Sequence, residues 1–128
     1  MKKDEQKLSE NIARYLVTQY KGLPFRFDIG ADIKLTIGQA SRVKNKLLHR
    51  RGHPDLFICK CCGGYGGLFI ELKKDKSEVF KFDGGYKKNS HLEEQIKYHE
   101  ELRKNGYKVV FGLGFDDTVN KIKEYLKG

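Results

Sequence analysis

The chain has 128 residues, and this length predicts a single domain spanning residues 1–128. Charged residues make up 34% of the sequence, but 8 Phe and 7 Tyr supply core volume, which argues against disorder. The net charge of +9 is typical of a small domain that binds a polyanion. No apolar run approaches the roughly 20 residues that cross a membrane, and none follows the N-terminus as a signal segment, so we expect a cytoplasmic protein.

The first third of the chain predicts two helices and a strand. Apolar residues recur at helical spacing over residues 4–20. Residues 25–28 alternate apolar and polar side chains, which predicts a short strand. Residues 36–49 predict a short basic helix. Its apolar side would carry Ile37, Val43, Leu47 and Leu48.

The centre of the chain predicts a hairpin of two largely buried strands. Residues 55–59 and 67–73 are apolar runs, and a Gly-rich stretch over 63–67 separates them. Near the tip are Cys59, Cys61 and Cys62. Their odd number and spacing fit no disulfide framework and indicate a reducing compartment. Residues 74–89 are rich in Lys and Gly and predict an exposed loop.

The C-terminal part predicts helix, strand and helix. Ser90 and Glu93 form a capping-box pattern, so a helix should begin at Ser90 and run to about Asn105. A strand should cover 107–113, and residues 116–118 can cap a last helix. The element order predicts an α/β domain in which helices flank a mixed central sheet.

Acidic residues are scarce in the middle of the sequence. Asp55 is the one carboxylate between Asp32 and Glu71, where average composition would give roughly five. Such depletion favours a surface that a phosphate backbone approaches, although a solvated basic face would have the same composition. The candidate DNA-binding residues are Arg42, Lys44, Lys46, Arg50, Arg51, Lys74 and Lys76.

Asp55, Glu71 and Lys73 carry the candidate chemistry. The two carboxylates come from neighbouring strands, and Glu71 shares its strand face with Lys73. Carboxylates in so apolar a setting are costly unless they are paired or bind metal. Two of them can share one hard cation, which activates water and polarises a phosphate, while the lysine offsets developing charge. The alternative is that Glu71 and Lys73 form an ordinary ion pair at the end of the sheet.

An ordered set of motifs resembles a known nuclease family. Pro54-Asp55 followed by Glu71-Leu72-Lys73 resembles the PD-(D/E)xK signature. The wider set is Arg51 to Ile58, Gly67 to Lys73, His91 to Gln95 and Gly106-Tyr107. Over nearly the whole chain this set resembles the VRR-Nuc family (virus-type replication-repair nucleases), in particular its small stand-alone phage and bacterial members. The resemblance implies a restriction-endonuclease-like core.

The resemblance also implies an activity and partners. The expected activity is Mg²⁺- or Mn²⁺-dependent endonucleolytic cleavage of DNA, with no organic cofactor. The expected substrate is branched DNA such as a Holliday junction, and the expected assembly is a homodimer. Asp55 and Glu71 would bind the metal with the Leu72 carbonyl as an extra ligand, and Lys73 would stabilise charge.

Two further site residues are expected on helices. The family motif carries its glutamine onto Gln95, which lies on the apolar stripe of its helix among Leu92, Ile96, His99 and Leu102. The family also uses a glutamate on the first helix. Glu5 shares the inward face of residues 4–20, whereas Glu10 lies opposite and can pair with Arg14, so helix geometry favours Glu5.

Two other functions fit parts of the sequence. One is a non-catalytic basic DNA-binding module whose carboxylates form ion pairs. The other is a zinc-stabilised interaction domain built on Cys59, Cys61, Cys62 and a histidine. The loop over 74–89 has two readings as well. It is either a plain solvated loop or, through Phe80, Phe82 and Tyr86 among its lysines, a grip on unpaired or distorted DNA.

Overall fold

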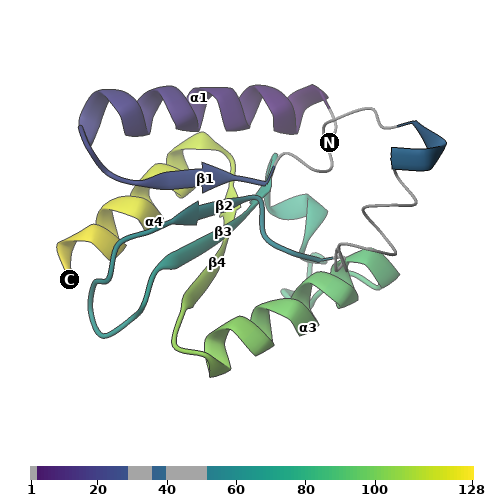
Figure 1. Ribbon diagram of the computed structural model, residues 1–128. Coiled ribbons are helices and arrows are strands. Elements are labelled where there is room, and N and C mark those ends of the chain that lie inside the picture. Colours follow the sequence, from purple (N-terminus) through teal and green to yellow (C-terminus); the bar gives the residue numbers. More distant parts are fainter. Residues whose placement is uncertain (1–2, 29–35, 40–51) are drawn as a thin grey trace.

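The structure is a computed structural model that describes residues 3–28, 36–39 and 52–128 (Figure 1). The predicted basic helix over 36–49 therefore lies mostly outside the described residues. Its start is described: residues 37–39 are helical. The Thr36 N–H donates to Gln39 Oε1 at 2.9 Å, and the Gln39 N–H donates to Thr36 Oγ1 at 3.1 Å. This reciprocal pair is a capping box, as expected where a helix begins.

A mixed sheet forms the centre of the described fold. Its strands are β1 (Phe25–Phe27), β2 (Leu56–Ile58), β3 (Leu68–Lys73) and β4 (Lys108–Leu113), in the spatial order β1-β2-β3-β4. Neighbouring strands are antiparallel from β1 to β3, and β4 runs parallel to β3. The predicted hairpin and the predicted α/β class with a mixed central sheet are confirmed.

Helices cover both faces of this sheet (Figure 1). The helices α1 (Lys3–Gln19) and α4 (Phe115–Lys127) pack on one face, and α3 (Ser90–Lys104) crosses the other. The main core lies between α1, α4 and the sheet. It contains Leu8, Ile12, Leu16, Leu56, Ile58, Leu68, Ile70, Leu72, Val119, Ile122 and Tyr125. No helix among the described residues is long and apolar enough to cross a membrane.

Strand β3 places the polar side chain of Glu71 between the sheet and α3. Its side chains alternate between the two faces of the sheet. Leu68, Ile70 and Leu72 join the core under α1 and α4. Phe69 stacks on Phe57 at 4.2 Å between ring centroids, and Glu71 meets a side chain of α3. The strand is buried on both faces, which explains why it reads as a continuous apolar run.

The start of α3 corrects the predicted capping box. Asn89 is the N-cap, and its side-chain oxygen accepts hydrogen bonds from the N–H groups of His91 at 2.9 Å and Leu92 at 3.2 Å. Ser90 is the first residue of the helix instead. Asn and Ser are equally good caps, so the sequence pattern selected the wrong one of two neighbours.

The start of α4 also differs from the prediction. Residues 116–118 lie inside its first turn, and the N-cap is Gly114, whose φ of 88° suits a residue without a side chain. The Asp117 carboxylate accepts from the Leu113 N–H at 2.9 Å, and the Thr118 hydroxyl donates to the Gly114 carbonyl at 2.6 Å. These residues therefore fix the turn between β4 and α4 without capping the helix.

Residues 74–89 are not a plain exposed loop. The segment contains the short helix η1 (Lys76–Glu78), and the Val79 that follows it is fully buried. Val79 packs with Leu92 and Phe111 in a second, smaller core beside α3. The Lys-rich composition of the segment gave no indication that Val79 is buried in a core.

Candidate active site

Asp55 is held against the strand that carries Glu71. It immediately precedes β2, and its Oδ2 accepts a hydrogen bond from the Leu72 N–H at 2.8 Å. Its carbonyl accepts from the Asp28 N–H at 2.7 Å, which fixes the backbone at the end of β1. The antiparallel register of β2 and β3 thus brings the Asp55 carboxylate beside Glu71, as the sequence predicted.

The two carboxyl groups form a buried pair. Burial is the main cause that raises the pKa of both, and the neighbouring Glu71 raises the pKa of Asp55 further. The Leu72 N–H and the charge of Lys73 oppose this effect at Asp55. Because two carboxylates this close repel each other, both are ionised near neutral pH only when a cation lies between them.

Lys73 does not neutralise the pair by direct contact. Among the described residues, the lysines in ion pairs are Lys81, Lys104 and Lys121, and none of these pairs joins Lys73 to Glu71. This finding contradicts the alternative in which Glu71 and Lys73 form an ordinary ion pair.

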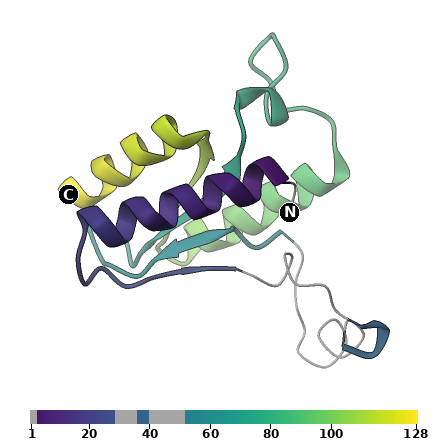
Figure 2. The same cartoon turned by 90° about the horizontal axis from the view of Figure 1, so that it is seen from above.

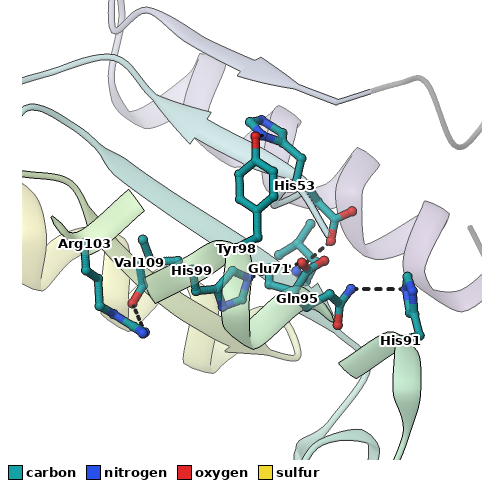
Figure 3. A network of polar contacts seen from close by, with 10 residues as sticks. His53, Glu71, His91, Gln95, Tyr98, His99, Arg103 and Val109 are labelled. Atoms are coloured by element: carbon teal, nitrogen blue, oxygen red, sulfur yellow. Dashed lines mark hydrogen bonds and ion pairs between the residues drawn. The ribbon is translucent and has the colours of Figure 1, made fainter. Parts of the chain in front are cut away.

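Helix α3 closes the site from the other side (Figure 3). Gln95 is only 4% exposed, and its Nε2 lies 3.3 Å from His91 Nε2. The buried oxygens Glu71 Oε1 and Gln95 Oε1 make no hydrogen bond in the described part of the chain. Such oxygens are rare in folded proteins and usually indicate a missing ligand.

His99 also faces Glu71, which the sequence analysis did not predict. Its Nε2 lies 3.5 Å from Glu71 Oε1 (Figure 3). Burial lowers the pKa of His99 to about 4, and the charges of Arg103 and Lys73 lower it further, so the ring is neutral near pH 7. The sequence feature that could have indicated this contact is the position of His99 four residues after Gln95, on the same apolar stripe of the helix. A histidine at such a position is usually interpreted as a core packing residue.

Asp55 and Glu71 do not line the open hollow of about 810 Å³ nearby, but Glu5, which interacts electrostatically with both carboxyl groups, does. Glu5, Lys73 and Gln95 line it from three different elements, and Lys74 and Glu78 lie at its wall. Burial raises the pKa of Glu5 to about 6, and a hydrogen bond with Glu78 adds to this effect. Glu10 is exposed on α1. The structure therefore brings Glu5 to the site and leaves Glu10 in solvent, as helix geometry indicated.

The candidate DNA-binding residues are only partly described. Arg42, Lys44, Lys46, Arg50 and Arg51 lie outside the described residues. Lys74 and Lys76 are both exposed, Lys74 beside the hollow and Lys76 on η1.

The donors present fit a hard divalent cation. No group of three or more His, Cys, Asp or Glu in the described ranges is arranged to hold a metal. The candidate ligands at this site are instead two carboxylates and the amide oxygen of Gln95, which makes no hydrogen bond among the described residues. All are oxygen donors, the type that Mg²⁺ and Mn²⁺ prefer, and a cation would favour the ionised forms of two carboxyl groups whose pKa values are raised chiefly by burial.

The cysteines lie away from these donors. Cys59, Cys61 and Cys62 are free thiols. They follow β2 at the hairpin tip, whereas Asp55 precedes β2 at its other end. Cys61 donates to the Gly66 carbonyl at 3.6 Å within this turn. They contribute nothing to the carboxylate site.

Comparison with known proteins identifies the fold. No protein-family model and no curated protein matches the chain. A solved structure described as a "VRR_NUC domain protein" matches with a TM-score of 0.67 and 26% sequence identity. The match covers 96% of this chain and 88% of the other. This likeness confirms, in motifs and in fold, the predicted resemblance to the VRR-Nuc family.

Proposed function

We propose that this chain is a metal-dependent endonuclease that hydrolyses DNA phosphodiester bonds, with residues 1–128 acting as one nuclease domain. The VRR-Nuc likeness supports a nuclease-type function. The observation that carries the proposal is the buried Asp55–Glu71 pair, which has no ion pair with a lysine among the described residues and lies near a hollow lined by Lys73 and Gln95. A structural role alone gives no reason to bury two repelling carboxylates together.

Each residue has a proposed role. Asp55 and Glu71 would hold Mg²⁺ or Mn²⁺, with the Leu72 carbonyl as a further ligand. An ion bound there would lower the pKa of a water molecule and polarise the scissile phosphate. Lys73 keeps a compact positive charge where negative charge grows on the phosphate. Gln95 orients the attacking water through its free amide oxygen, and Glu5 acts at the outer rim.

The proposed substrate is branched DNA, such as a four-way junction. Resolving a junction takes two symmetric cuts, and one domain supplies one site. A homodimer with a two-fold axis would supply both. Light scattering at micromolar concentration tests this assembly, and an active monomer on junction substrates would contradict it.

A cleavage panel tests the proposed activity. Duplex, flap, fork and four-way-junction DNA are incubated with Mg²⁺, Mn²⁺ or EDTA. We expect cleavage with either metal, none with EDTA, and preference for branched substrates. Asp55→Asn and Glu71→Gln should each abolish cleavage while DNA binding persists. Glu10→Gln is the matched control because it removes an exposed carboxylate, and its activity should be that of the wild type.

Lys73→Arg extends the panel to the proposed charge-stabilising group. A planar guanidinium cannot replace a compact ammonium beside a bound ion, so cleavage should be severely reduced. Full activity of Lys73→Arg would assign Lys73 a structural role. Binding of DNA without cleavage by the wild type, under every condition, would favour a non-catalytic DNA-binding module. Stoichiometric zinc in the purified protein would favour the zinc-stabilised interaction domain.

A further inference from the structure

A small hairpin stands out from the body of the protein next to the candidate active site. It spans residues 79–87, between η1 and α3, and projects away from the helices in Figure 2. Its base is anchored by the buried Val79, and the Lys87 N–H donates to the Val79 carbonyl at 2.8 Å. The Lys81 N–H donates to the Gly85 carbonyl at 2.7 Å, and Phe80 pairs with Tyr86 across the hairpin. The 79–87 hairpin is therefore a defined structural element held by backbone hydrogen bonds.

Three aromatic side chains lie on this hairpin: Phe80 packs against the smaller core, and Phe82 and Tyr86 are exposed. The rings of Phe80 and Tyr86 stack with centroids 5.4 Å apart and an interplanar angle of 20°. Phe82, next to the tip, is fully exposed, and Tyr86 is half exposed. A fully exposed Phe contributes nothing to the stability of a hydrophobic core, so on this projecting turn the ring is available for contact with a ligand.

Positive charge surrounds these rings. A hollow of about 970 Å³ is lined by Phe80, Phe82, Lys76, Lys81 and Lys87. Asp83 also lines it and lies 3.9 Å from Lys81, and Asp75 interacts electrostatically with Lys87, so the three lysines outnumber the two nearby carboxylates. A ligand that suits this surface has a flat apolar face and a negative charge beside it. A nucleotide has both, in its base and its phosphate.

The hollow on the hairpin shares lining residues with the hollow beside the candidate active site. Ser77 and Lys87 line both the hairpin hollow and the hollow that contains Glu5 and Lys73. A strand of DNA with its phosphate at the carboxylate pair could therefore extend along Lys87 to Phe82. Bases inside a duplex are stacked on both sides, so Phe82 reaches a base face only where the DNA is single-stranded or opened.

We propose that the 79–87 hairpin is a binding site for an unpaired nucleotide, in which Phe82 stacks on the base and Lys76, Lys81 and Lys87 contact the neighbouring phosphates. The proposal rests on the proposed function for its location beside the cleavage site, and it names the feature that makes branched DNA the preferred substrate. Its binding test does not require cleavage.

The test measures binding in EDTA, where no cleavage occurs. The probes are an oligonucleotide single strand and a blunt duplex, each with one 2-aminopurine, and both affinity and fluorescence change are recorded. Phe82→Ala should weaken single-strand binding roughly 5- to 100-fold, the range of one base–aromatic stack, and abolish the stacking-dependent fluorescence change. Duplex affinity should change little. Phe82→Tyr keeps a ring and should bind as the wild type does.

A matched control removes an exposed apolar side chain elsewhere. Val17 is 63% exposed on α1, so Val17→Ala should leave single-strand binding unchanged. Phe82→Ala should not change the thermal unfolding midpoint, since the ring packs against nothing. Equal losses on single strand and duplex, or no loss on either, would overturn the proposal. A shift of Phe82→Ala from dimer to monomer would also overturn it, because the hairpin would then be a contact between copies.

The two proposals can fail separately. Stacking by Phe82 without cleavage under any condition would retain the nucleotide site and remove the nuclease assignment. Cleavage by the wild type, with Phe82→Ala unchanged in single-strand binding, would retain the nuclease and remove the stacking site.

Discussion

His99 Nε2 lies 3.5 Å from Glu71 Oε1, and these two side chains are 1% and 3% exposed (Figure 3). Because burial keeps His99 neutral, one ring nitrogen carries a proton and the other does not. The two atoms make no hydrogen bond in this geometry, but a proton on Nε2 would need only a small shift to reach Glu71 and orient its carboxylate. We therefore interpret His99 as a positioning residue that acts through Glu71 and touches neither substrate nor metal.

Replacing His99 should reduce turnover more than substrate binding. His99→Phe fills the space without an N–H, so we expect kcat to fall roughly 10-fold with KM nearly unchanged. His99→Gln carries an amide N–H at a position close to Nε2 and should recover part of the loss. Steady-state cleavage kinetics measure both parameters. Wild-type kcat in His99→Phe would show that the ring serves only for packing.

The buried carboxylates make stability depend on pH in a defined direction. A raised pKa means that the folded state binds protons more tightly than the unfolded state. Without divalent ions, the contribution of these two carboxyl groups to stability should therefore be greatest below about pH 4, the ordinary carboxyl range, and should fall as the pH rises through the raised values, whereas the lowered pKa of His99 acts in the opposite direction at acid pH. Glu71→Gln cannot ionise, so at pH 8 it should be more stable than wild type by about 1 kcal/mol or more. Urea unfolding from pH 4 to 8 gives both curves, and parallel curves would contradict the prediction.

Divalent cations should stabilise the folded protein through the same pair. A ligand at 100 times its dissociation constant adds about 2.7 kcal/mol to a fold that alone can bind it. We expect Mg²⁺ or Mn²⁺ to raise the thermal midpoint of the wild type and to have no such effect on Asp55→Asn or Glu71→Gln. Glu10→Gln should respond as the wild type does. An equal response in Glu71→Gln would place the ion elsewhere on the chain.

Gly52 holds α3 at its distance from Asp55. Its φ is 93°, and an added Cβ would lie 2.9 Å from the Glu94 carbonyl oxygen and 3.2 Å from Gln95 Cα. These are backbone atoms of α3, so Gly52→Ala must displace either its own segment or the helix that carries Gln95. We expect a loss of stability of about 1–3 kcal/mol and of most cleavage activity.

Gly22→Ala is the matched control for this effect. Gly22 also has a positive φ, of 80°, but an added Cβ there meets nothing within 4 Å. It should lose stability through backbone strain alone and retain cleavage activity. Chemical unfolding and cleavage rates measure both variants. Similar activity in the two alanine variants would show that the close approach of Gly52 to α3 does not position Gln95.

The sheet and its carboxylate pair were predictable from sequence because they depend on local patterns. Two apolar runs around a Gly-rich turn specify a hairpin, and a hairpin brings Asp55 beside Glu71. The preference for Glu5 over Glu10 followed from helical spacing in the same way. These inferences need only the periods of strands and helices.

The features that were missed depend on contacts between distant segments. His99 looks like any polar residue on an amphipathic stripe until α3 is placed on β3. Val79 is hidden among lysines, and only its packing on Leu92 and Phe111 shows that residues 74–89 are anchored. Asn89 is the cap because its backbone is extended and the helical conformation begins at Ser90. Residue type alone does not specify this conformation.

The parallel pairing of β3 with β4 implies an order of folding. Asp55 and Leu72 are 17 positions apart and meet through one turn, whereas β4 reaches β3 only after the whole of α3. Local contacts close faster because their loops cost less entropy. The carboxylates should therefore meet while still hydrated, and their repulsion should become costly when α3 docks and excludes water. High pH without divalent ions should therefore destabilise the state in which α3 is docked, and because this contact forms late, the unfolding rate, more than the refolding rate, should respond to the charge of Glu71.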